Sequence, residues 1–85
     1  MNLLENILDY YIEESFLIAD GFNESVIGVE IPSMRLIYSV SKVIETLIIE
    51  DEMNLEDALE HFEYNIRSSY VGEKTPIWCD DMYLN

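Results

Sequence analysis

Closely spaced carboxylates are the side chains of this sequence whose pattern points most directly to chemistry. Seven of them lie between positions 50 and 63, where no Lys or Arg occurs: Glu50, Asp51, Glu52, Glu56, Asp57, Glu60 and Glu63. Three more, Glu5, Asp9 and Glu13, recur every four residues near the N-terminus, a spacing that aligns side chains on one face of a helix. Rows of fixed negative charge attract a basic protein surface and accelerate its encounter, an effect that salt weakens.

These carboxylates predict a binding surface for a basic protein partner. The predicted partner-binding residues are all of them except Asp57, whose spacing of four from His61 favours a local helical pair. A second interpretation stays open, because an acidic helix face is also typical of proteins that need only remain soluble. The whole chain carries 18 acidic and 4 basic residues, a formal net charge of −14, which disfavours direct binding to nucleic acid or to an anionic membrane.

Metal binding and catalysis find little support in the sequence. Asp80 and Asp81 are adjacent, but no EF-hand spacing occurs. His61 and Cys79 each lack the neighbouring ligands of a zinc site. A single His also cannot supply both the base and the orienting group that a nucleophile needs. We therefore expect no metal, no cofactor and no enzymatic activity.

The stretch FEYNIRSSYVGEKTPIW, residues 62–78, contains a second group of candidate residues. Asn is a poor helix former, so Asn65 in a helix interior is expected to bond either nearby backbone or a ligand. Tyr64, Thr75 and Trp78 accompany it at a predicted helix–strand junction. Core packing is the commoner use of such aromatic residues. The alternative function is a small-molecule or divalent-cation binding module, whose ligand would be a polyamine or a divalent ion.

Helical periodicity and cap residues predict three helices that position these side chains. Apolar spacing begins after Asn2 and predicts a helix from residue 3 to about 15. Ser39 is expected to cap a buried central helix. Asn54 is expected to cap a third helix, which continues to Gly72 and carries Tyr70 on its apolar face.

Runs of β-branched and aromatic residues predict three strands. Residues 25–31 and 34–40 should form an antiparallel pair joined at Pro32-Ser33, with either a bulge or a closely packed neighbour at Gly28. Residues 77–79 should form an edge strand, because Pro76 at its start lacks a hydrogen-bond donor. The order is helix, two strands, two helices, strand. The predicted fold class is α+β, one domain over residues 1–85 with three helices packed on a small, mainly antiparallel sheet.

Composition also predicts the environment and assembly of the chain. One cysteine permits no internal disulfide, which fits the cytoplasm. The N-terminus lacks the basic region of a signal peptide, and no apolar run approaches the roughly 20 residues of a membrane span. A chain of 85 residues buries a thin core, yet 49% of its residues are apolar. A homodimer is therefore expected, through the 77–79 edge or near Tyr10 and Tyr11.

Three segments resemble a family of small uncharacterised acidic proteins encoded by tailed bacteriophages and some bacteria: DGFNESVIGVE (20–30), RLIYSVSKVIE (35–45) and EDALEHFEYNIRSSYVGEKTPIW (56–78). The resemblance runs from about residue 17 to the end, and its most specific positions are Phe62, Glu63, Asn65, Gly72, Thr75, Pro76 and Ile77. It implies a phage accessory protein in the host cell cytoplasm and carries no established activity. By analogy with other small acidic phage proteins, it favours an inhibitor that mimics nucleic acid and blocks a host defence or nucleic-acid-handling enzyme.

Overall fold

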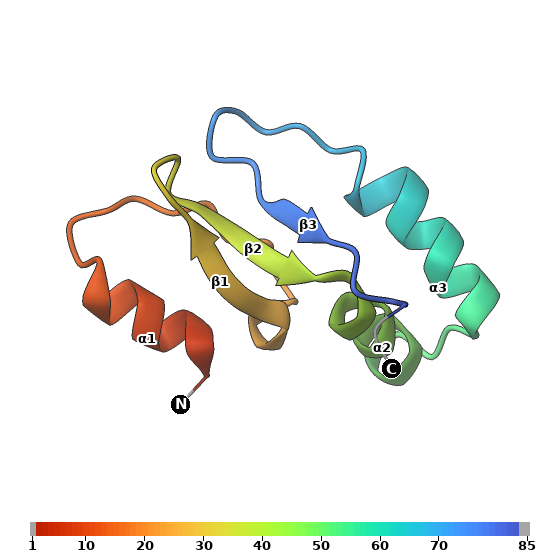
Figure 1. Ribbon diagram of the computed structural model, residues 1–85. Coiled ribbons are helices and arrows are strands. Elements are labelled where there is room, and N and C mark those ends of the chain that lie inside the picture. Colours follow the sequence, from red (N-terminus) through yellow and green to blue (C-terminus); the bar gives the residue numbers. More distant parts are fainter. Residues whose placement is uncertain (1, 84–85) are drawn as a thin grey trace.

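A computed structural model describes residues 2–83 (Figure 1), and its α-helices and β-strands follow the predicted order with two further helical segments added between them. The elements are α1 (Leu3–Tyr10), β1 (Val26–Glu30), β2 (Arg35–Ser39), α2 (Val40–Glu50), α3 (Leu55–His61) and β3 (Ile77–Cys79). A short 3₁₀ helix, Asn23–Ser25, precedes β1, and a π-helical segment, Phe62–Ile66, continues α3. The α+β class is confirmed.

The three strands form one mixed sheet in the order β1-β2-β3. β1 and β2 are antiparallel, whereas β2 and β3 are parallel, with Ile37 opposite Ile77 and Tyr38 opposite Trp78. The sheet was expected to be mainly antiparallel, but one of its two strand pairings, β2 with β3, is parallel. The reason is the connection, because α2 and α3 carry the chain from the end of β2 back to its start, as a parallel crossover requires.

Two local features of the first two strands agree with the sequence. The pairing of β1 with β2 shifts by one residue between Val26 and Gly28, as the predicted bulge requires, whereas the alternative of a close neighbour is wrong because a Cβ at Gly28 would have nothing within 4 Å. The last residue of β2, Ser39, accepts a hydrogen bond from the Lys42 backbone N–H and caps α2. The strand therefore passes into the helix without a loop.

The first helix is shorter than predicted, because it ends at Tyr10 and not near residue 15. Tyr11 leaves the helical conformation, and its ring meets the ring of Phe16 at 6.3 Å between centroids. Like charges at every fourth position lower helix stability, and no basic residue in the last turn offsets them. Glu13 consequently lies outside the helix.

The third helix also departs from the prediction that it runs to Gly72. The α-helix ends at His61 and widens into the π-helical segment, in which the Arg67 N–H donates to the Phe62 carbonyl at 2.8 Å. Gly72 has a φ of 114° but lies in the following loop, where its carbonyl accepts from Thr75. Tyr70 is 77% exposed and joins no apolar stripe.

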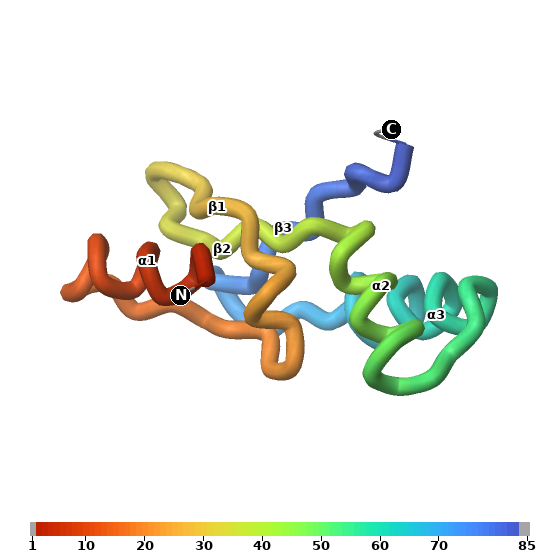
Figure 2. The backbone as a smooth tube through the Cα atoms, turned by 90° about the horizontal axis from the view of Figure 1, so that it is seen from below, coloured from red at the N-terminus to blue at the C-terminus, as the bar shows by residue number. Residues whose placement is uncertain are grey.

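The core lies on one face of the sheet and between the sheet and the helices. Leu36 and Tyr38 of β2 are fully buried, together with Val43 and Leu47 of α2. The segment between α1 and β1 passes along the sheet, where the Ala19 N–H donates to the Tyr38 hydroxyl at 2.7 Å. α1 lies at one end of the molecule and the α2–α3 pair at the other (Figure 2).

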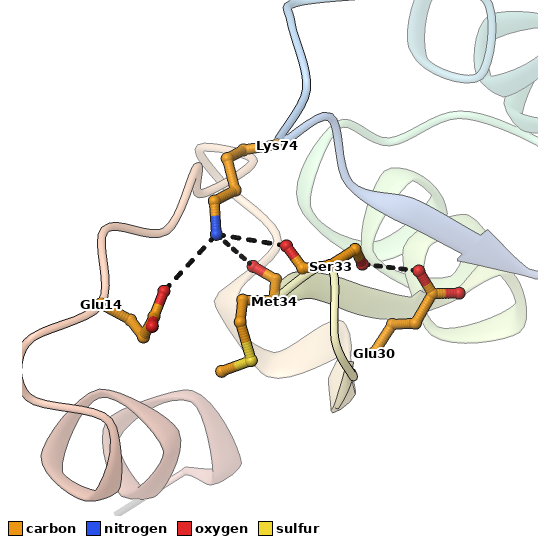
Figure 3. A network of polar contacts seen from close by, with 5 residues as sticks. All are labelled: Glu14, Glu30, Ser33, Met34 and Lys74. Carbon is orange, nitrogen blue, oxygen red and sulfur yellow. Dashed lines mark hydrogen bonds and ion pairs between the residues drawn. The ribbon is translucent and has the colours of Figure 1, made fainter.

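Lys74, in the loop before β3, contacts both the turn between β1 and β2 and the loop after α1, at the end of the sheet away from α2 (Figure 3). Its Nζ donates to the carbonyls of Ser33, at 3.2 Å, and Met34, at 3.1 Å, in the turn between β1 and β2. The same Nζ lies 3.6 Å from Glu14 Oε1 and 5.9 Å from the ring centroid of Phe16. The segment before β3 is thus held against both the hairpin turn and the loop after α1.

Candidate functional site

Six predicted partner-binding carboxylates lie along the end of α2, the connection and α3. We call this set the acidic α2–α3 surface: Glu50, Asp51, Glu52, Glu56, Glu60 and Glu63. All six side chains are exposed. Asn54 Oδ1 accepts from the Asp57 backbone N–H at 2.8 Å and caps α3, so the predicted cap is confirmed and the carboxylates of α3 stand on a fixed backbone.

The carboxylates near the N-terminus do not join that surface. Glu5 and Asp9 lie on α1, which is at the other end of a molecule 39 Å long (Figure 1). Glu5 Oε2 accepts from the Asn2 backbone N–H in a reciprocal capping box, and Glu13 stands beyond the helix. The predicted ladder is therefore two helical residues and one loop residue, all exposed.

Few cations compensate the negative charge. Within residues 2–83, ion pairs join only Arg67 to Glu63 and Lys74 to Glu14. Five of the six carboxylates of the acidic α2–α3 surface are consequently without an ion-pair partner in that range. Uncompensated charges on a rigid helix present a stable negative field to solvent.

The second group of candidate residues gathers around Trp78 without forming one pocket. Tyr64 and Trp78 line one hollow, Asn65 and Trp78 another, and Thr75 and Trp78 a third. Thr75 is engaged locally, since its hydroxyl donates to the Gly72 carbonyl at 2.6 Å. It therefore serves the loop before β3.

Asn65 has the specific contact that its place in the helix predicts. Its Nδ2 lies 3.2 Å from His61 Nδ1, one helical turn earlier. The predicted pairing of His61 with Asp57 is thus replaced by a pairing with Asn65 in the described chain. The π-helical segment that contains Asn65 changes the helical spacing at this point.

The hollow shared by Tyr64 and Trp78, about 520 Å³ in volume, lies between α3 with its π-helical continuation and the end of β3. We call it the aromatic pocket. Its lining comprises three aromatic residues, three other apolar residues and four charged residues: Phe62, Tyr64, Trp78, Val40, Leu59, Met82, Glu60, Glu63, Arg67 and Asp80. Phe62 and Trp78 meet edge to face, with centroids 5.7 Å apart.

Sequence reasoning missed several residues of this pocket. Asp80 and Met82, which follow β3, were not predicted to line the pocket. The adjacent acids Asp80 and Asp81, directly after a predicted strand, were the polar signal that could have indicated this position. Arg67 was overlooked, although the predicted helix to Gly72 places it four residues after Glu63, which is the spacing of a helical ion pair. The parallel β2–β3 pairing, which brings Asp80 near Val40, had no signal in the local pattern.

Asp81, beside the pocket, binds the start of α2. Its Oδ2 accepts from the Ser39 hydroxyl at 2.6 Å and its Oδ1 from the Ser41 N–H at 2.8 Å. Desolvation raises the pKa of Asp81, but the hydrogen bonds from Ser39 and Ser41 outweigh it and hold the pKa below its ordinary value. Ser39 is fully buried, so this Ser–Asp contact fastens the chain and does not present a nucleophile.

Among the described residues, no group of three or more His, Cys, Asp or Glu side chains is placed to hold a metal ion. No helix within residues 2–83 is both long and apolar enough to cross a membrane.

Comparison with known proteins gives no match from which a function could be inferred, so the function is argued from the geometry described above. The chain matches no protein-family model, no curated protein and no solved structure. The resemblance to phage-encoded acidic proteins therefore stays a prediction.

Proposed function

We propose that this protein is a non-enzymatic binding protein whose acidic α2–α3 surface binds and inhibits a basic protein. The observation that carries the proposal is the exposure of all six carboxylates, of which only Glu63 has an ion-pair partner among the described residues. A surface that serves only solubility needs no such concentration of negative charge, because positive and negative charges interspersed on the surface would serve it better. A helix also holds the charges in place before the partner arrives, which lowers the entropy cost of binding.

The class of partner follows from the same charges. The exposed acids of this surface resemble the phosphates of a nucleic acid in the sign and density of their charge, and a protein that neutralises phosphates offers Lys and Arg to meet them. We infer a nucleic-acid-handling or defence enzyme of a host cell, bound by mimicry in the cytoplasm. The phage context rests on the sequence resemblance alone.

Matched charge reversals test the proposal. One variant carries Glu52→Lys, Glu56→Lys and Glu60→Lys, and its control carries Asp9→Lys, Glu13→Lys and Asp20→Lys at exposed positions that do not belong to the acidic α2–α3 surface. Each set raises the formal net charge by the same six units. Wild-type protein, both variants and salt washes are compared in pull-downs from host lysate with mass spectrometry.

The expected result is that wild type and control enrich the same basic protein and the α2–α3 variant does not. Enriched protein should elute as salt rises, because screening weakens the attraction. Equal enrichment by all three proteins, with unchanged circular dichroism, would contradict the proposal. Loss of capture in the control alone would place binding near α1 and Asp20 instead.

The second candidate, a module for a polyamine or a divalent ion, has one observation in its favour, which is the acidic side of the aromatic pocket. A thermal-shift screen distinguishes it. Spermidine or Mg²⁺ should raise the melting temperature more than NaCl of equal ionic strength does. An equal shift with NaCl would remove this candidate.

A further inference from the structure

We propose that the aromatic pocket receives one long cationic side chain, arginine or lysine, from a basic segment of the partner. The inference rests on the proposed function and deepens it, because Glu60 and Glu63 belong both to the pocket and to the acidic α2–α3 surface. It assigns the pocket a specific role within a broad electrostatic contact.

The inner part of the pocket suits the stem of such a side chain. Phe62 and Val40 are buried in the core, and Trp78 is half-buried beside them. The methylene stems of Lys and Arg pack on apolar surface while their charged ends stay at the edge. Aromatic rings add to this, because guanidinium and ammonium groups are attracted to ring faces.

The charged residues of the pocket select for positive charge. Glu60, Glu63 and Asp80 line it, against the single cation Arg67. Arg67 is already paired with Glu63, whereas Glu60 and Asp80 have no ion-pair partner within residues 2–83. A phosphate or carboxylate ligand would meet net negative charge here, and a cationic end group would meet two carboxylates that have no ion-pair partner within residues 2–83.

Two further observations mark this place in the fold. The backbone of Phe62–Ile66 is π-helical, and π-helical turns inside α-helices occur often at functional sites. The Trp78 Nε1 atom is buried and has no hydrogen-bond partner among the described residues. A buried donor without an acceptor is uncommon, so the junction of the π-helical turn with β3 is not optimised for stability alone.

The experiment uses Trp78 as its reporter, because it is the only tryptophan of the chain. The full-length protein is titrated with the peptide acetyl-Ala-Arg-Ala-Arg-Ala-amide, and with the same peptide carrying lysine, citrulline or norleucine in place of both arginines. Citrulline keeps the shape of arginine without its charge. Tryptophan emission and calorimetry are recorded with wild type and with Glu60→Gln, Tyr64→Ala and Glu45→Gln.

Saturable emission changes are expected with the arginine and lysine peptides, and roughly tenfold weaker binding with citrulline or norleucine. Glu60→Gln and Tyr64→Ala should each weaken the binding affinity for the arginine peptide by roughly threefold to tenfold. Glu45→Gln makes the same charge change at an exposed position of α2 outside the pocket, and should have a smaller effect.

The other outcomes distinguish a failure of the inference from a failure of the proposed function. Equal binding of the norleucine peptide would show an apolar docking site without charge selection. Equal weakening by Glu60→Gln and Glu45→Gln would show that only the overall negative field acts, which would refute the pocket and leave the proposed function standing. Selective peptide binding together with unaltered pull-downs by the α2–α3 variant would refute the proposed function and keep the pocket.

Discussion

Asp81 accepts a 2.6 Å hydrogen bond from the hydroxyl of Ser39, which lies 42 residues earlier in the chain. Ser39 is both the last residue of β2 and the cap of α2, so one carboxylate fastens the segment after β3 to the joint between the central strand and the central helix. The same carboxylate also accepts from the Ser41 N–H. This contact keeps Asp80 and Met82 beside the aromatic pocket.

Asp81→Asn should lower the free energy of unfolding at pH 6 by about 1–2 kcal/mol, because charged acceptors make the stronger hydrogen bonds. The pKa of Asp81 is lower in the folded protein than its ordinary value of 3.8. The stabilisation is therefore present above pH 3.8 and is lost as the pH falls through the lowered pKa. Urea denaturation of wild type and Asp81→Asn from pH 3 to 6 measures this stabilisation. A difference in unfolding free energy that does not change with pH would show that the ionised Asp81 carboxylate is not its source.

Lys74→Met should destabilise the protein by about 1–2 kcal/mol, because two carbonyls and one carboxylate lose a charged donor. Arg67→Met is the matched control, since its pair with Glu63 is an exposed pair four residues apart on the helix, worth about 0.3–0.5 kcal/mol. Thermal and urea denaturation compare the two. Equal losses would show that Lys74 acts as an ordinary surface charge.

Tyr38→Phe should destabilise the protein by about 1 kcal/mol at neutral pH, because the Ala19 N–H loses its acceptor inside the structure. Burial raises the pKa of Tyr38 above 10.0, although the hydrogen bond from Ala19 opposes the shift. Its contribution is fully present below pH 10.0 and is lost as the pH rises through the raised pKa. Wild type should therefore lose more stability than Tyr38→Phe does between pH 9 and 11, as followed by circular dichroism in urea.

Gly72→Ala should destabilise the protein, whereas Gly28→Ala should leave its stability nearly unchanged. At Gly72, φ is 114°, a conformation that L-residues rarely adopt, so alanine should cost about 1–2 kcal/mol. A Cβ at Gly28 would have nothing within 4 Å, and its backbone needs no positive φ, so alanine should change stability by less than about 0.5 kcal/mol. Denaturation midpoints of both variants measure these changes in stability, and a large loss of stability in Gly28→Ala would show that the bulge requires glycine.

The predicted homodimer is tested by sedimentation at low and at physiological salt. β3 is an edge strand, as predicted, although its residues are half-buried, and Tyr10 is 78% exposed. Association should strengthen as salt screens the repulsion between two chains of charge −14. A monomer at both salt concentrations and at high protein concentration would contradict the prediction.

Local patterns predicted most of the elements because the responsible forces are local. Asn2, Ser39 and Asn54 each accept a backbone N–H at a helix start, and the bulge at Gly28 lies where the strand has no side chain to pack. The ends of α1 and α3 were misplaced for tertiary reasons. Tyr11 turns toward Phe16, and the π-helical turn begins at Phe62, which packs on Trp78.

The candidate site was predictable in charge and only partly in shape. The carboxylates from Glu50 to Glu63 could be read directly, since surface charge needs no knowledge of the partner elements. The separation of α1 from α3 could not, because it depends on how the helices are placed around the sheet. Asp80 and Met82 reach Phe62 and Glu63 through the parallel pairing of β3, which local periodicity does not encode.

That parallel pairing also has a kinetic consequence. β1, β2 and α2 follow one another with short or no connections, so their contacts close small loops, whereas Ile37 and Ile77 meet across forty positions. Closing the longer loop costs more entropy and delays the contact in folding. We expect β3, a strand of three residues at the sheet edge, to dock last and to detach first. The Trp78 wall of the aromatic pocket would thus be the last part of the fold to assemble.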